Sequence, residues 1–121
     1  MSLPEAKSRM FPNAIYANLS CADLDASVSW FRRLFGRDAD AAPMAGLVEW
    51  YHGEGAGLQI HLDPGKAGSG TLTLIVDDLR AAKTRLGDLA PGEIESGDAT
   101  SVLRLYDPDG NLVVLAQPGR A

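Results

Sequence analysis

The chain has 121 residues, of which 45% are hydrophobic and 22% charged, and its formal net charge is −5. This balance is typical of a folded globular protein, and an acidic chain without a basic run argues against nucleic acid as a partner. No apolar run approaches the roughly 20 residues of a membrane helix, so no membrane partner is expected. The single cysteine, Cys21, cannot form an internal disulfide and no cleavable signal pattern opens the chain, which together predict a cytoplasmic location.

The first half of the chain predicts a strand, a helix and three further strands. The helix has the clearest pattern, because Leu24, Val28, Phe31 and Phe35 recur at spacings that place them on one face. An aspartate before the helix caps its first amides, and a glycine ends it. The expected elements are a strand at 14–21, a helix at 24–35, a weak strand near 39–42, and strands at 46–52 and 57–63.

The second half repeats this order at a constant offset, so each position of the first half has one counterpart in the second. Asp23 corresponds to Asp78 and Leu24 to Leu79, each pair lying where a strand passes into a helix. The expected elements are a strand at 71–76, a helix at 78–89, and strands near 93–96, at 100–106 and at 111–117. A glycine-containing linker at 66–70 separates the two copies.

Each half therefore has the order βαβββ, and neither is large enough to close a core alone. We expect an α+β fold in which two tandem βαβββ modules form a curved mixed sheet around a concave pocket, with the helices outside. Module 1 spans residues 14–65 and module 2 spans residues 70–117. Together they form a single domain at 14–120, preceded by an N-terminal tail at 1–13.

Two motifs carry a family resemblance. One is CADLDASVSWF at residues 21–31, followed by LFG at 34–36, and the other is a terminal hairpin, DPDGNLVVL, at 107–115. With the repeat, they resemble the vicinal oxygen chelate superfamily, which includes glyoxalase I, bleomycin resistance proteins, fosfomycin resistance enzymes and extradiol dioxygenases. The resemblance spans about residues 14–117 and implies the glyoxalase/bleomycin-resistance fold, but it does not choose among the activities of the superfamily.

In metal-using members, His, Glu or Gln side chains hold a divalent ion in the concave face, and the resemblance implies four positions for them here. These are Tyr16, Gln59, Thr71 and Val114, and the repeat offset relates the first to the third and the second to the fourth. Valine cannot bind a metal, threonine is a poor neutral donor, and a tyrosine must first ionise. Only the glutamine is a fair ligand, so no metal and no other cofactor is expected.

A divalent metal remains the alternative because of His61. This residue follows Gln59 by two positions and so points to the same side of the strand, where it could replace a lost ligand or act as a general base. The competing interpretation is a histidine that only hydrogen-bonds within the cavity. A rearranged set built from His61, Gln59, Glu49 or Tyr16 would make the protein a metal-dependent lyase, isomerase or dioxygenase.

The turn at 107–110 sets the register of the last two strands. It pairs residue 107 with residue 111, which places Arg104 opposite Val114 and turns Arg104 and Tyr106 toward the concave side. The offset maps Glu49 onto Arg104, so we expect the two charges to face each other across the pocket. Arg104 then either binds a ligand carboxylate or phosphate, pairs internally with Glu49, or is exposed if the register differs by one residue.

Strand alternation predicts a polar and aromatic pocket that suits an organic ligand held by hydrogen bonds and stacking. The expected ligand-binding residues are Tyr16, Asn18, Glu49, Gln59, His61, Thr71, Thr73, Arg104, Tyr106 and Val114. Trp50 is expected in the core beneath the helix, or in the pocket wall if the register slips.

These observations favour a metal-free small-molecule-binding protein, similar in type to the bleomycin resistance proteins, that sequesters an antibiotic or toxic compound. A homodimer is expected, since such relatives usually dimerise, and the modules could pair within one chain or exchange between two. The alternatives are the metal-dependent enzyme described above and a structural or interaction module whose pocket is filled. The residues do not identify a catalytic group.

Overall fold

The structure is a computed structural model and describes residues 11–121, so most of the expected tail at 1–13 lies outside the described residues. Module 1 contains β1 (Ile15–Cys21), α2 (Leu24–Phe35), β2 (Ala41–Met44), β3 (Leu47–His52) and β4 (Ala56–Leu62). A short 3₁₀ turn, η1 (Pro64–Lys66), leads to module 2, which contains β5 (Thr71–Ile75), α3 (Leu79–Leu86), η2 (Gly87–Leu89), β6 (Thr100–Tyr106) and β7 (Leu112–Pro118).

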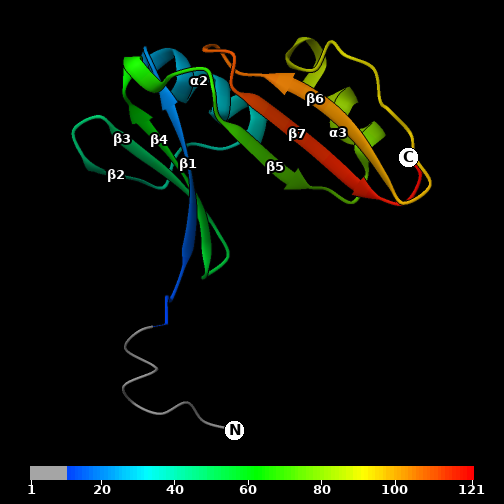
Figure 1. The fold of residues 1–121 in the computed structure, drawn as a ribbon, viewed down its shortest axis with the longest axis horizontal. Helices are drawn as coiled ribbons and strands as arrows, with labels where there is room; N and C mark the ends of the chain where they lie inside the picture. The colour runs from blue at the N-terminus through cyan, green and yellow to red at the C-terminus, as the bar shows by residue number, and fades with distance from the viewer. Residues whose placement is uncertain (1–10) are drawn as a thin grey trace, which may run out of the picture.

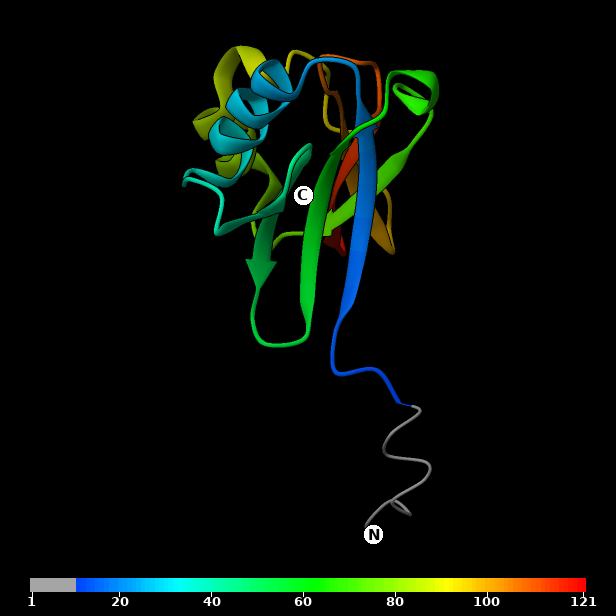
Figure 2. The ribbon, with the colours of Figure 1, turned by 90° about the vertical axis from the view of Figure 1, so that its left-hand side faces the viewer.

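The strands form two mixed sheets, one in each module. Their orders are β1-β4-β3-β2 and β5-β7-β6. In each module the first strand runs parallel to the last, and the strand before the last runs antiparallel to it. Figure 1 shows the two sheets side by side, and Figure 2 shows both helices on the same side of them. The expected α+β fold of two modules with outer helices is confirmed, although the curved surface is divided between two sheets.

The same residue type starts both helices. Asp23 Oδ1 accepts a hydrogen bond from the backbone N–H of Ala26 at 3.1 Å, and Asp78 Oδ1 accepts one from Ala81 at 3.0 Å. Each carboxylate satisfies a free amide and faces the positive end of the helix dipole. Because these caps correspond to each other in the sequence repeat, the offset seen in the sequence is also the offset of the structural repeat.

The strand registers repeat with the same offset. Asn18 lies beside Gln59 in module 1, and Thr73 lies beside Val114 in module 2. Arg104 lies beside Val114 on the other side, as the terminal turn predicted. The predicted pairing of the last two strands is therefore confirmed.

Module 2 differs from module 1 where a fourth sheet strand was expected. The expected strand at 93–96 is wrong, because this segment makes only one β-bridge, between Glu95 and Val102. Pro91 and Gly97 flank the segment and disfavour a continuous strand ladder. As a result, β6 is the edge strand of its sheet.

The second helix is also shorter than expected. It was predicted over 78–89, but α3 ends at Leu86. Gly87 takes a φ of 57°, a value that favours glycine, and the chain continues as the 3₁₀ turn η2. No helix within residues 11–121 has the length and hydropathy needed to cross a membrane.

The largest buried side chain lies under the helix of module 1. Trp50 is 2% exposed, and its ring centroid is 6.2 Å from that of Phe31 and 5.7 Å from that of Phe35. Its Nε1–H donates to the backbone carbonyl of Arg37 at 3.1 Å. The core interpretation of Trp50 is therefore confirmed.

A buried asparagine joins the two modules. Asn111 is fully buried, and its Oδ1 accepts hydrogen bonds from the backbone N–H groups of Gly68 and Gly70 at 3.1 and 2.8 Å. Its Nδ2 donates to the carbonyl of Ser20 in module 1 at 2.9 Å and to Asp107 Oδ2 at 2.8 Å. The amide thus makes all four hydrogen bonds available to it, and these bonds fix the linker, β1 and the terminal turn together.

The turn that carries Asn111 also contacts module 1 through an aspartate. Asp107 Oδ1 accepts from the N–H groups of Asp109 and Asn111, which is the turn chemistry that the sequence suggests. Asp109 Oδ1 accepts from the N–H of Ala22, just before α2, at 2.9 Å. Asp109 therefore connects the modules as well as shaping its own turn.

One ion pair joins two equivalent positions of the repeat. Arg33 Nη2 lies 2.5 Å from Asp88 Oδ1, and the repeat offset maps the first of these residues onto the second. Nearby, the Arg85 guanidinium donates to the backbone carbonyls of Arg33 and Leu34 at the end of α2. The helical sides of the two modules are thus connected by groups that the repeat places symmetrically.

Candidate functional site

A chain of hydrogen bonds crosses the open face of the module 1 sheet, on the side away from the helices. Asn18 Nδ2 donates to Gln59 Oε1 at 3.2 Å, and Gln59 Nε2 donates to Glu49 Oε2 at 2.7 Å. The hydroxyl of Tyr51 donates to Glu49 Oε1 at 2.9 Å. The structure therefore brings together three of the predicted site residues, from β1, β4 and β3, and adds Tyr51.

Glu49 is the buried charge at the centre of this chain. It is 5% exposed, and each of its oxygens accepts a hydrogen bond from a neutral group. Among residues 11–121, the ion pairs all involve other acidic side chains. A buried carboxylate without a positive partner is unfavourable, and its remaining lone pairs can accept further hydrogen bonds.

The Glu49 carboxylate also changes the pKa of the neighbouring Tyr51. The hydrogen bond to Glu49, followed by burial, raises the pKa of Tyr51 above its ordinary value. The phenol of Tyr51 therefore stays protonated and remains a hydrogen-bond donor.

Tyr16 lies across the same sheet but does not point toward Gln59. Its ring is next to Gly57, where an added Cβ would lie 3.1 Å from the ring, so glycine is needed for this close approach. The ring centroids of Tyr16 and Tyr51 are 5.9 Å apart. His61, which follows Gln59 by two positions, is exposed at the end of β4, and the hydrogen bonds described above do not include it.

The site positions of the second module form a more open surface. Thr71, Thr73, Arg104 and Tyr106 are exposed, and Val114 is half-buried. Arg104 forms an ion pair with Glu95. Of the alternatives for Arg104, the internal pair with Glu49 is not formed, because each residue has different partners and the irregular segment before β6 supplies the acid. The hydrogen bond and charge of Glu95 raise the pKa of Arg104, which keeps its positive charge.

The four positions implied for a metal do not offer a fitting donor set. Tyr16 packs on Gly57, Gln59 already uses both ends of its amide, and the other two positions hold threonine and valine. Residues 11–121 also contain no group of three or more His, Cys, Asp or Glu side chains that could hold a metal. The residues present therefore do not fit the divalent ion of metal-using relatives.

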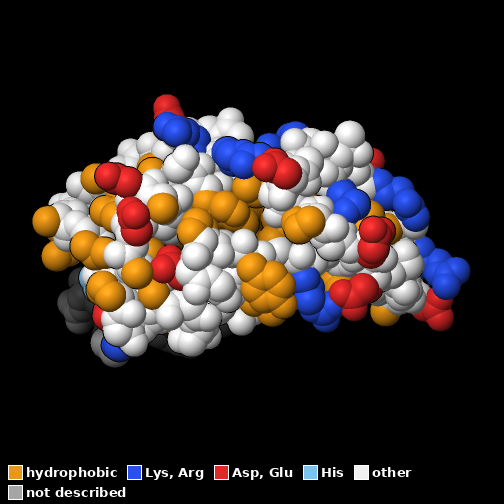
Figure 3. All heavy atoms as spheres, turned by 90° about the horizontal axis from the view of Figure 1, so that it is seen from above, with side chains coloured by type: hydrophobic (Ala, Val, Ile, Leu, Met, Phe, Trp, Pro, Cys, Tyr) orange, Lys and Arg blue, Asp and Glu red, His pale blue; other side chains and the backbone are white. Residues whose placement is uncertain are grey.

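Large apolar side chains are exposed on the open faces of both sheets. Ile75 is 68% exposed, Tyr106 is 61%, Tyr16 is 42% and Tyr51 is 37%. Figure 3 looks down on the upper end of the molecule and shows hydrophobic side chains gathered near its middle, between groups of charged ones. Exposed apolar surface of this kind suits contact with a ligand or another protein surface.

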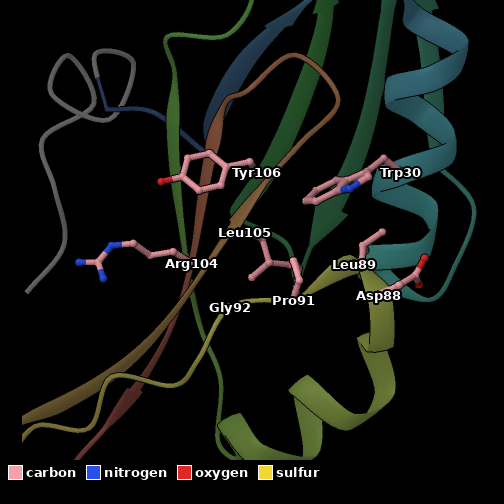
Figure 4. A pocket seen from close by; sticks show the side chains of 8 residues that line it. All are labelled: Trp30, Asp88, Leu89, Pro91, Gly92, Arg104, Leu105 and Tyr106. Carbon is pink, nitrogen blue, oxygen red and sulfur yellow. The ribbon is translucent and has the colours of Figure 1, made fainter.

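A separate cavity of about 350 Å³ lies on the outer side of β6. Figure 4 shows the side chains of Trp30, Leu89, Pro91 and Leu105 around one space, whereas the Tyr106 side chain points away from it. Asp88, Gly92, Arg104 and Tyr106 complete the lining. Another cavity, of about 240 Å³, is lined by His52 and by residues of α2, β5 and α3. Except for Arg104 and Tyr106, the predicted site residues lie outside both cavities.

The predicted site omitted three residues that shape these surfaces. Tyr51 could have been found, since it shares the strand parity of Glu49 and the repeat offset maps it onto Tyr106. Glu95 lies in the segment that was wrongly predicted as a strand, and Trp30 belongs to a helix whose partner surface the sequence does not show.

Comparison with known proteins identifies the fold. No protein-family model matches the chain, and no curated protein matches it. Among solved structures, a glyoxalase/bleomycin resistance protein from Catenulispora acidiphila is 26% identical, with a TM-score of 0.79 over 87% of this chain and 97% of that one.

Two further structures have the same fold. A lactoylglutathione lyase from Agrobacterium tumefaciens is 22% identical, with a TM-score of 0.71 over 88% of this chain and 94% of that one. A bleomycin-binding protein, solved in complex with bleomycin, is 24% identical, with a TM-score of 0.67 over 87% of this chain and 98% of that one. The chain therefore has the glyoxalase/bleomycin-resistance fold, which is the fold that the resemblance to the vicinal oxygen chelate superfamily implies.

Proposed function

We propose that this chain binds a small organic molecule without a metal ion, on the open faces of its sheets, and thereby sequesters it. The observation that carries this proposal is the state of Gln59, the one fair ligand among the four implied metal positions. Its Oε1 accepts from Asn18 and its Nε2 donates to the buried Glu49. The position thus serves a network of hydrogen bonds, and its three counterparts offer no carboxylate or imidazole.

The chemistry of this surface favours a ligand that combines an aromatic or apolar part with hydrogen-bond donors. Tyr16 and Tyr51 supply ring surface, and Glu49 supplies unneutralised acceptor atoms beside them. A protein of the same fold has been solved with bleomycin, which supports binding of a small molecule by this architecture. Bleomycin is therefore the first probe.

The proposal includes a second copy of the chain. The open faces of the two sheets lie side by side in one chain, so neither covers the other. Ile75 and Tyr106, both more than half exposed, lie on these faces. A homodimer that brings the module 1 face of one chain against the module 2 face of the other would bury this apolar surface and enclose the ligand.

Metal binding tests the proposal directly. Protein purified without chelators should contain no stoichiometric transition metal, and titration with Zn²⁺, Ni²⁺ or Mn²⁺ should give no saturable heat. A matched variant, Tyr16→His with Thr71→His and Val114→Glu, restores the donor types and should gain metal binding if the four positions converge. Stoichiometric metal in the natural chain, lost in His61→Ala, would instead establish the enzyme alternative.

Ligand binding forms the other half of the test. In a thermal-shift series with bleomycin and with aromatic amines, a compound that binds the folded state should raise the unfolding midpoint. The effect should be lost in Glu49→Gln and kept in Glu95→Gln, which removes the same charge from module 2. If no compound shifts the midpoint and the chain stays monomeric, the binding function is contradicted.

A further inference from the structure

One residue that lines the cavity beside β6 has a much larger counterpart in module 1. The repeat offset relates Leu105 to Trp50, whose indole packs against Phe31 and Phe35. Module 2 has a leucine and an alanine where module 1 has these two phenylalanines. Of these three smaller residues, Leu105 lines the cavity of about 350 Å³, at the position where the larger Trp50 packs in module 1.

Beside the cavity, part of the β6 backbone has no hydrogen-bond partner among the described residues, and Gly92 lies close to the Arg104 carbonyl, where a Cβ added to the glycine would lie 3.5 Å away. Val102 exchanges two backbone hydrogen bonds with Glu95, at 3.0 and 2.9 Å, across the outer edge of the strand. In an antiparallel ladder every second residue points its N–H and C=O to the same edge, so Arg104 and Tyr106 point theirs outward as well. Within residues 11–121, no partner bonds to these outward groups.

The corresponding groups of module 1 all have partners. The carbonyl of Glu49 accepts from the N–H of Asp40 at 2.8 Å, and the N–H of Tyr51 donates to Asp40 Oδ2 at 2.6 Å. The carbonyl of Tyr51 accepts from the Arg37 guanidinium at 2.5 Å. Module 2 therefore lacks both the bulky side chain and the edge partner that close this position in module 1.

We propose that the cavity beside β6 binds a planar heteroaromatic molecule whose edge carries a hydrogen-bond donor next to an acceptor. The ring would lie against Trp30, over the apolar surface of Leu89, Pro91 and Leu105 (Figure 4). A cavity of this volume lies at the lower end of the range for ligand pockets, which suits one bicyclic ring system.

The polar edge of the ligand pairs with the strand. The outward C=O of Arg104 and N–H of Tyr106 present an acceptor and a donor next to each other, and a lactam or aminopyrimidine edge offers the complementary pair. The side chains of both residues point away from the cavity, so the ring reaches the backbone without displacing them (Figure 4). This site is separate from the open-face site, which uses the side chains of the same strand.

The test compares two ligands of nearly identical shape by NMR. Isoquinolone is a flat bicyclic lactam, and N-methylisoquinolone lacks only its N–H donor. Isoquinolone should give saturable shifts of the Trp30 indole N–H and of the Arg104 and Tyr106 amides. The chain has two tryptophans, so the buried Trp50 N–H is an internal control that should not move. The N-methyl compound should bind about tenfold more weakly, since one hydrogen bond is lost.

A variant that copies module 1 should close the site. Leu105→Trp places an indole where Trp50 has one, and it should abolish isoquinolone binding. Leu62→Trp is the matched control, because Leu62 is 42% exposed and lies outside the cavity. It should bind isoquinolone as the natural chain does. The comparison of the two ligands needs no variant, so the proposal stays testable if Leu105→Trp does not fold.

Several results would overturn the proposal. These are equal affinity for the two ligands, shifts at Trp50 in place of Trp30, undiminished binding by a folded Leu105→Trp variant, or no saturable shift at millimolar isoquinolone. A strand from a second copy is the competing occupant of the edge. If the Arg104 and Tyr106 amides are protected from exchange only at concentrations where the chain self-associates, that strand occupies the edge and the proposal is wrong.

Discussion

β3 in module 1 and β6 in module 2 are equivalent strands of the repeat, but their neighbours in the sheets differ. β3 lies between β4 and β2, and it carries the buried Glu49 and Trp50. β6 lies at an edge, and the equivalent residues are the exposed Arg104 and the smaller Leu105. Module 1 thus has a buried tryptophan on its helix side and a buried charge on its open face, whereas module 2 has a leucine and an exposed charge at the equivalent positions.

This difference shows how a repeated backbone can carry two kinds of surface. The helix caps and strand registers are the same in both modules, so the divergence lies in side-chain volume and in the pairing of one edge. Symmetry of the fold therefore does not imply symmetry of the sites. The following predictions test the contrast, from the largest expected effect to the smallest.

Replacing Asn111, which joins the two modules, should reduce stability most, because its repeat counterpart cannot make the same hydrogen bonds. Asn111→Ala removes four hydrogen bonds at a fully buried position, and it should lower the free energy of unfolding by about 3–5 kcal/mol. The counterpart of Asn111 in module 1 is Ala56, which shows that the repeat alone does not require an amide. Urea unfolding measures the loss, with the exposed Asn13→Ala as control. An unchanged midpoint would mean that the modules do not depend on this junction.

Making module 1 resemble module 2 should have the next largest effect. Trp50→Leu removes packing against Phe31 and Phe35 and the hydrogen bond to the Arg37 carbonyl, at a cost of about 3 kcal/mol. The reciprocal change, Leu105→Trp, should not reduce stability if the cavity can accept an indole. Equal losses in both variants would show that the two outer sides are packed alike, and the contrast between the modules would then fail.

The buried carboxylate should be visible in an alkaline titration. The pKa of Tyr51 is raised above 10.0, so one of the three tyrosines should ionise later than the others in tyrosinate absorbance. Glu49→Gln should remove the delay and, through the altered hydrogen bonds, cost about 1 kcal/mol of stability. Glu95→Gln should leave the titration of Tyr51 unchanged. A delayed phenol that persists without the Glu49 charge would contradict the network.

Replacing Asp40, at the edge of the module 1 sheet, should change stability least, and only at acidic pH. The N–H of Tyr51 and then the Arg37 guanidinium lower the pKa of Asp40 below 3.8. A lowered pKa in the folded state stabilises the protein above the ordinary value, and this contribution is lost as the pH falls through the lowered one. Asp40→Asn should therefore weaken the loss of stability below about pH 3.8. Glu54→Gln, which removes an exposed charge, should leave the acid profile less affected than Asp40→Asn does.

Much of the fold could be predicted because local chemistry and tertiary structure agree. The apolar stripe from Leu24 to Phe35, the capping aspartates and the turn after Asp107 each require the structure that the chain adopts. The strand predicted near 93–96 was wrong, since this segment pairs with its neighbour at one residue only. Strand pairing at an edge depends on neighbours that the sequence pattern does not specify.

For the candidate site, the sequence predicted on which face of the sheet the residues lie, but not which residues they contact. Strand alternation placed Asn18, Gln59 and Glu49 on one surface, because parity fixes the direction of a side chain. The choice of Glu95 as partner of Arg104 depends on the path of an irregular segment, which parity does not describe. The cavity beside Trp30 is lined by residues of both modules, so it becomes visible only when their arrangement in space is known.

The ion pair between Arg33 and Asp88 has a consequence for assembly. Arg33 and Asp88 are counterparts in the repeat and contact each other, so two copies of the same module paired in this way would bring like charges together there. Two copies of module 1 would thus place arginine against arginine and repel each other, whereas module 1 and module 2 place arginine against aspartate and attract each other. The opposite charges at this single point favour association of unlike halves, and they disfavour an assembly made from either half alone.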